Sequence, residues 1–173
     1  MIQKYKQTTG ESCLATDLLQ LVGKKITRQA ELDLLFSALR FDRNNYVLSH
    51  LKYVVKKYNL KFDFFIDNKH FYKFVSSRNK SKEVVISRQK IDLRFIDSRL
   101  NISPLITYVD TFPFWKINHA AHFIIVIKKV KNYYKIYDPW DGKVKLINSK
   151  ILSKGIINLR NLIKNSPVVI QKM

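Results

Sequence analysis

The sequence predicts an α+β fold in which an N-terminal helical lobe packs on a C-terminal antiparallel β-sheet. Apolar residues recur at helical spacing through residues 13–58. Beyond residue 104, short runs rich in β-branched and aromatic residues alternate with turn residues. Helices followed by consecutive strands are typical of the α+β class.

Length and composition favour a single domain over residues 1–173, with a helical part of about 1–100 and a sheet part of about 101–173. The chain has 173 residues, of which 46% are hydrophobic and 13% aromatic, which is enough for a substantial core. It has only four Gly and four Pro, and no low-complexity tract or repeat divides it. We therefore expect no flexible linker.

The first three elements are expected to be helices. Leucines follow Cys13 at roughly helical spacing as far as Val22, and Gly23 stands where that helix would end. Thr27 can cap a second helix, and residues 46–58 carry an apolar face that predicts a third.

The expected strands lie mostly in the second half. Residues 61–66 predict a first short strand, and residues 67–99 are ambiguous, with one or two helices around Val84–Ile86. Further strands are expected over residues 105–109, 122–130, 133–138, 144–147 and 168–171, with a helix over 149–164. Lys131-Asn132 and Asp141-Gly142 supply turns between them.

The charge and the termini restrict the function only loosely. The net charge is +19, but the lysines are spread along the whole chain, so a solvated basic surface is favoured over a nucleic-acid or anionic-membrane site. The longest apolar run, Phe123 to Ile127, is too short to span a membrane. No signal-like stretch occupies the first residues. A cytoplasmic protein is expected, and a single cysteine agrees with that compartment.

Cys13 is a candidate nucleophile because it stands at the start of a predicted helix. The free N–H groups and dipole of a helix start favour negative charge, and a nearby imidazolium would add to the effect. Both lower the pKa of a thiol and so favour the reactive thiolate. An inert core cysteine remains the alternative.

Gln7, six positions earlier, is a candidate oxyanion donor. A loop of that length can fold back and point the side-chain amide at the thiol, beside the backbone N–H of Cys13. One such donor stabilises a transition state by about 3 kcal/mol. A solvated loop glutamine is the alternative.

His122 and Asp138 are candidates for the base and its orienting carboxylate. They flank two strands joined at Lys131-Asn132, so an antiparallel hairpin would bring them together. A carboxylate bonded to one imidazole nitrogen leaves the other free to face a thiol. The alternatives are a turn role for Asp138 and His119 as the base. Too few further ligands accompany His119 and His122 for a metal pair, so no metal and no cofactor is expected.

Two blocks resemble those of a known family. The first is Gln7-Thr-Thr-Gly-Glu-Ser-Cys13-Leu-Ala-Thr-Asp-Leu-Leu; the second is His122-Phe-Ile-Ile-Val-Ile followed by Tyr137-Asp138-Pro139-Trp-Asp-Gly142. Together they are similar to the double-glycine leader peptidases, which process bacteriocins and have a papain-like fold. The sequence departs from the family at Leu14, where glycine is common, and at Ser12, which separates Glu11 from Cys13.

The resemblance implies a papain-like cysteine peptidase with Cys13 as nucleophile, His122 as base, Asp138 as orienter and Gln7 in the oxyanion hole. The expected reaction is cleavage of an amide bond in a peptide or protein substrate through a thioester. An acyltransferase using the same acyl-enzyme is one alternative. A catalytically inactive basic binding module is the other alternative. Trp115 and Trp140 are candidates to line the cleft near His122, and a packing role is the alternative for both.

Overall fold

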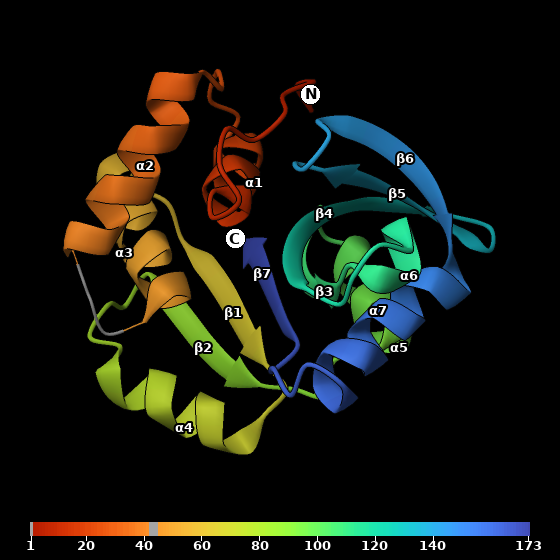
Figure 1. Cartoon of the computed structure of the whole chain (residues 1–173). Coiled ribbons are helices and arrows are strands. Elements are labelled where there is room, and N and C mark those ends of the chain that lie inside the picture. Colours follow the sequence, from red (N-terminus) through yellow and green to blue (C-terminus); the bar gives the residue numbers. More distant parts are fainter. Residues whose placement is uncertain (1, 42–44) are drawn as a thin grey trace.

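The computed structural model describes residues 2–41 and 45–173, and it contains one mixed sheet with helices on both faces (Figure 1). The helices are α1 (Cys13–Leu21), α2 (Arg28–Phe41), α3 (Tyr46–Tyr58), α4 (Lys69–Arg78), α5 (Leu93–Leu100), α6 (Phe112–Trp115) and α7 (Ser149–Asn161). The strands are β1 (Phe62–Ile66), β2 (Val84–Arg88), β3 (Leu105–Asp110), β4 (Ala121–Val130), β5 (Tyr133–Asp138), β6 (Lys143–Asn148) and β7 (Val168–Lys172).

The sheet has seven strands in the order β2-β1-β7-β3-β4-β5-β6. Strands β1 and β2 are parallel and are joined through α4, whereas every other neighbouring pair is antiparallel. The sheet is therefore larger than the expected C-terminal one, because β7 pairs with β1 as well as with β3. Both halves of the chain contribute to a single sheet.

Each face of the sheet has its own apolar core, because successive side chains of a strand point to opposite faces. Phe64 and Ile125 pack with α1, α3 and α4, whereas Phe65 and Ile124 pack with α5 and α7. The first group of helices lies on the left of Figure 1 and the second on the right. The α+β class predicted from the sequence is confirmed.

Helix starts follow from side-chain caps that the sequence supplies. Asn45, Asn68, Asp92 and Asn148 each accept a hydrogen bond from a backbone N–H in the first turn of the helix that follows. Thr27 caps α2 through Ala30 N at 3.1 Å, as expected. The helix predicted over residues 46–58 is present with the same bounds. The ambiguous segment forms α4, β2 and α5.

The N-terminal segment lies against the turn between β5 and β6. Gly142, in that turn, has a φ of +69°, and a Cβ there would lie 2.6 Å from the backbone N of Lys6 and from the carbonyl carbon of Tyr5. The Tyr137 hydroxyl donates to the Tyr5 carbonyl oxygen at 2.5 Å. Gln7 N donates to the Pro139 carbonyl at 2.7 Å. Only glycine at position 142 permits this approach.

Gly142→Ala should therefore destabilise the fold more than the same change at Gly23. Gly23 also has a positive φ, +71°, but its added Cβ would meet nothing within 4 Å. We expect Gly23→Ala to lower the free energy of unfolding by about 1 kcal/mol. Gly142→Ala should lower it by about 3 kcal/mol, because backbone must also move. Urea denaturation measures both, and equal losses would contradict the close packing of Tyr5 and Lys6 on the turn.

Candidate active site

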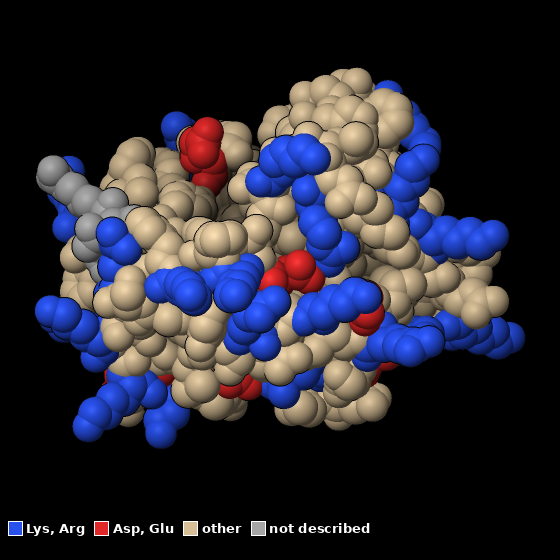
Figure 2. Space-filling model, turned by 90° about the horizontal axis from the view of Figure 1, so that it is seen from below, with Lys and Arg blue, Asp and Glu red and all other residues tan. Residues whose placement is uncertain are grey.

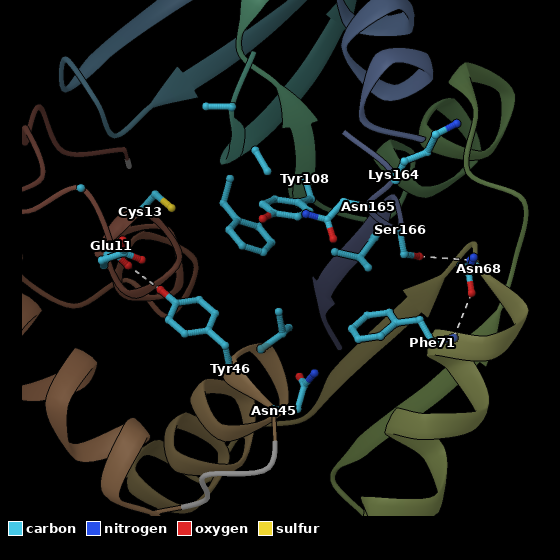
Figure 3. Close-up of a pocket in the computed structure, with 16 residues that line it drawn as sticks. Glu11, Cys13, Asn45, Tyr46, Asn68, Phe71, Tyr108, Lys164, Asn165 and Ser166 are labelled. Atoms are coloured by element: carbon cyan, nitrogen blue, oxygen red, sulfur yellow. Dashed lines mark hydrogen bonds between the residues drawn. The ribbon is translucent and has the colours of Figure 1, made fainter. Parts of the chain in front are cut away.

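Cys13 is the first residue of α1, which packs on β4. The N-cap residue Ser12 makes no side-chain cap, and the first backbone bond of the helix runs from Thr16 N to the Ser12 carbonyl. Because no side chain caps this end, the first N–H groups of α1 are available to an anion. The thiol is 8% exposed, and its sulfur points into a cavity (Figure 3).

The thiol is not activated in the way that its helix position predicts. Burial, the largest cause, and the nearby Asp17 carboxyl together raise the pKa of Cys13 to about 12. Backbone N–H groups of Phe123 and Leu14 lower the pKa only in part. The expectation of a depressed thiol pKa is therefore wrong for this state, because loss of hydration outweighs the helix start. At rest the sulfur carries its proton.

His122 and Asp138 lie together at one end of the β4–β5 hairpin, as the sequence suggests. Nε2 of His122 is 3.0 Å from Oδ1 of Asp138, and both side chains are buried. The two strands turn at Lys131, which has a φ of +54°. Because Nε2 faces the carboxylate, Nδ1 is the nitrogen left for other chemistry.

Asp138 accepts hydrogen bonds at both oxygens. Oδ1 also accepts from Trp140 N at 3.0 Å, while Oδ2 accepts from Trp115 Nε1 at 3.0 Å and from Lys145 Nζ at 2.9 Å. Burial alone would raise the pKa of this carboxyl, but the hydrogen bonds from His122 and Lys145 and the charge of Lys145 lower it to about 2. Asp138 is therefore a fixed anion at neutral pH.

Two aromatic residues enclose this pair. The Trp115 ring lies 5.2 Å from the His122 ring and 5.5 Å from the Trp140 ring, measured between centroids. Burial of the imidazole–carboxylate contact beside the Trp115 indole keeps water from this contact and strengthens it. Both tryptophans were candidates to line the cleft; they lie beside His122 and Asp138 but do not line the cavity at Cys13, and Lys145 was not predicted. The pairing of β5 with β6 could have indicated Lys145, because Asp138 is opposite Lys143 and Lys145 lies two positions further on the same face of β6.

Gln7 lies close by but has another contact. Its side chain is 6% exposed, and Nε2 donates to the Thr9 carbonyl at 2.7 Å. Oε1 is buried without a hydrogen-bond partner among the described residues. One amide proton of Nε2 is used by Thr9, so one remains available.

Glu31, on α2, holds the segment that carries Gln7. Its buried carboxylate accepts from the Tyr5 hydroxyl at 2.5 Å and from Thr8 N at 2.7 Å. It also accepts from the hydroxyls of Thr8 and Ser12. Four donors from the N-terminal loop therefore converge on one anion, which fixes the loop between Gln7 and Cys13. Sequence reasoning missed this residue, since a glutamate in a helix is normally solvated.

Asp17 is one helical turn after Cys13 and is fully buried. Neither of its carboxyl oxygens has a partner among the described residues. Burial raises its pKa well above the usual value, and the Asp138 anion adds to the shift. A carboxyl in such surroundings keeps its proton.

His119, the competing base, forms a separate pair. Its Nδ1 is 2.8 Å from Oδ2 of Asp110, and its ring stacks on Phe112 with centroids 4.5 Å apart. Neither His119 nor Asp110 lines the cavity at Cys13. Within residues 2–41 and 45–173, no cluster of three or more His, Cys, Asp or Glu side chains is arranged to hold a metal ion.

The cavity in front of Cys13 has a volume of about 810 Å³. Figure 3 shows its side chains: Tyr46, Phe71 and Tyr108 point into it, and Asn165 extends toward Tyr108 from the opposite rim. The Tyr46 hydroxyl donates to the Glu11 carbonyl at 2.5 Å, which ties α3 to the loop before Cys13. Cavities of this size hold small ligands or short peptide segments.

A solved structure shares this architecture. It is named as a "putative C39-like peptidase" from Bacillus anthracis, with a TM-score of 0.58 and 10% sequence identity over 99% of this chain and 95% of the other. The likeness confirms the predicted papain-like fold and, at that identity, the fold alone. Neither protein-family models nor curated proteins match the sequence. In the part of the chain that the structure describes, no helix has the length and apolarity needed to cross a membrane.

Glu31→Gln should loosen the loop between Gln7 and Cys13. The change removes the charge and places an amide N–H₂ against donors, so we expect the free energy of unfolding to fall by about 3 kcal/mol. Glu83→Gln is the matched control, because Glu83 is exposed and should shift stability by less than about 0.5 kcal/mol. Urea denaturation at neutral pH compares them, and similar losses in both variants would contradict the role of Glu31.

Asp17→Asn should stabilise the protein increasingly as the pH rises. The pKa of Asp17 is raised in the folded state, so above about pH 4 the unfolded chain releases a proton that the folded one keeps. Stability of the parent then falls with pH, by up to about 1.4 kcal/mol per pH unit, and asparagine removes this loss. Denaturation of both proteins between pH 4 and 8 measures the difference. The exposed Asp33→Asn is the control, and a pH-independent difference for Asp17→Asn would refute the assignment.

Proposed function

We propose that this chain is a cysteine peptidase-like hydrolase that cleaves an amide bond of a peptide substrate through a Cys13–His122–Asp138 triad. The observation that carries the proposal is the buried hydrogen bond between His122 and Asp138. The residue after His122 on β4, Phe123, presents its backbone N–H to the Cys13 sulfur.

In this proposal the two ring nitrogens of His122 have different tasks. Nε2 is held by Asp138, so Nδ1 is the proton acceptor for the thiol. No hydrogen bond joins the Cys13 thiol to the imidazole within the described residues. Such contacts often tighten only when substrate is bound, and the proposal requires this one to form in the substrate complex.

The high thiol pKa favours general-base attack over a resting ion pair. As the carbonyl of the substrate enters, Nδ1 of His122 removes the Sγ proton, and the sulfur forms a C–S bond to the carbonyl carbon. The imidazolium is stabilised by Asp138, which stays ionised because its pKa is about 2. The protonated ring then gives its proton to the leaving amine, and water hydrolyses the thioester.

The oxyanion of the tetrahedral intermediate has two candidate donors. The backbone N–H of Cys13 belongs to an uncapped helix start, and the Gln7 amide has one free proton. Each donor would contribute about 3 kcal/mol to transition-state stabilisation. If an amine replaces water in the second step, the same acyl-enzyme gives an acyltransferase.

Single substitutions of the three triad residues should each reduce peptide cleavage, whereas substitutions of neighbouring residues should not. We expect Cys13→Ala to abolish cleavage of a peptide library and His122→Ala to reduce it about 10²- to 10⁴-fold. Asp138→Asn should reduce it by up to about 10⁴-fold, because the wrong tautomer is then held. Cleavage products are followed by mass spectrometry.

His119→Ala is the matched control, because His119 is also paired with an aspartate but stacks on Phe112 and belongs to a pair separate from Asp138. It should keep nearly full activity. Equal loss in His119→Ala and His122→Ala, or cleavage that survives Cys13→Ala, would overturn the proposal.

A basic binding module is the second candidate. Its support is the net charge of +19, and Figure 2 shows Lys and Arg spread over one face of the molecule with few acidic side chains between them. Retention of DNA or RNA that falls steeply with salt, and is unchanged by Cys13→Ala, would favour this function.

A further inference from the structure

Aromatic rings form part of the wall of the cavity beside Cys13, next to polar residues such as Asn68 and Asn165. Tyr46 enters from α3, Phe71 from α4 and Tyr108 from β3 (Figure 3). The Tyr108 ring stacks on Phe123 with centroids 4.2 Å apart, so this wall is fixed. A glycine in this space would leave most of the aromatic surface in water, whereas a large apolar side chain would cover it.

The alternation of β4 places this cavity on the acyl side of the scissile bond. Ala121 and Phe123 line the cavity, and His122 between them points to the opposite side of the strand, against Trp115. Because His122 must protonate the leaving amine, the leaving group lies on the side of Trp115. The part of the substrate that stays on the Cys13 sulfur therefore lies in the cavity.

The far wall offers polar groups on a rigid support. Lys164 has a left-handed φ of +60° just after α7, and Asn165 N donates to the Leu159 carbonyl at 3.0 Å. Asn68 N donates to Ser166 Oγ at 3.1 Å, which ties this loop to the start of α4. No described residue hydrogen-bonds to the Asn165 carboxamide, so it can pair with the N–H and C=O of an extended peptide.

We propose that this cavity is the acyl-side subsite and that it selects a peptide with a large apolar side chain within the two residues before the scissile bond, with Asn165 holding the peptide backbone. This inference rests on the proposed peptidase function. It implies that a peptide ending in two glycines at the cleaved bond is a poor substrate.

Peptidyl chloromethyl ketones test the subsite directly, since the sulfur displaces chloride and the adduct is read by intact mass. The probes are acetyl-Gly-Gly, acetyl-Phe-Gly and acetyl-Gly-Phe chloromethyl ketones. We expect one of the phenylalanine probes to label Cys13 at least about 10-fold faster than the Gly-Gly probe. Phe71→Ala and Tyr108→Leu should each reduce that preference several-fold, and Asn165→Ala should slow all three probes alike.

Phe74→Ala is the matched control, because Phe74 is on the same helix as Phe71 but is 40% exposed and does not line the cavity. It should leave the preference unchanged. Equal labelling by all probes, or a preference untouched by Phe71→Ala and Tyr108→Leu, would overturn the subsite while leaving the peptidase function standing.

Binding to the Cys13→Ala variant separates the two proposals. Acetyl-Phe-Gly, acetyl-Gly-Phe and acetyl-Gly-Gly amides are titrated by NMR, with shifts followed for Phe71, Tyr108 and Asn165. Preferential binding of a phenylalanine peptide, together with absent labelling in the parent, would uphold the subsite and refute the nucleophile. Indiscriminate or absent binding would refute the subsite.

Discussion

The buried carboxylate of Glu31 is the constraint on which the site depends. It collects hydrogen bonds from the Tyr5 hydroxyl, the backbone and hydroxyl of Thr8, and the Ser12 hydroxyl. A buried anion is tolerated only when donors surround it, so the loop must keep this shape. The shape brings Gln7 against Pro139 and sets Cys13 at an uncapped helix start. A residue of α2 thus determines where Gln7 and Cys13 lie.

Burial has opposite consequences for three ionisable groups near one another. Asp138 is ionised because His122, Lys145 and two tryptophans satisfy it, whereas Asp17 has no partner and keeps its proton. The Cys13 thiol is also neutral, since its few backbone donors do not replace lost water. Of these three groups only Asp138 is therefore charged, and it lies against the His122 ring.

Local pattern was sufficient to predict most elements, because helix periodicity, caps and turn residues act over a few positions. The helix Tyr46–Tyr58 and the Lys131 turn are examples. The His122–Asp138 contact was also predictable, since one hairpin determines it. Features that depend on contacts between distant segments could not be predicted from local pattern. They are the pairing of β7 with β1, the hydrogen bonds that converge on Glu31, and the raised pKa of the Cys13 thiol. Each of these features arises where segments that are far apart in the sequence pack against one another and bury the groups between them.

The central place of β7 in the sheet bears on the order of folding. Residues 168–172 pair with β1 on one side and β3 on the other, so they join the two halves of the sheet. Until this strand is available, β1 and β3 have exposed edges and the loop at residues 164–167 has no fixed position. The cavity wall formed by that loop therefore assembles late, through contacts of long sequence separation. The side chains that line the cavity from the two halves of the chain, such as Tyr46 and Ser166, thus come together only after the last strand has paired.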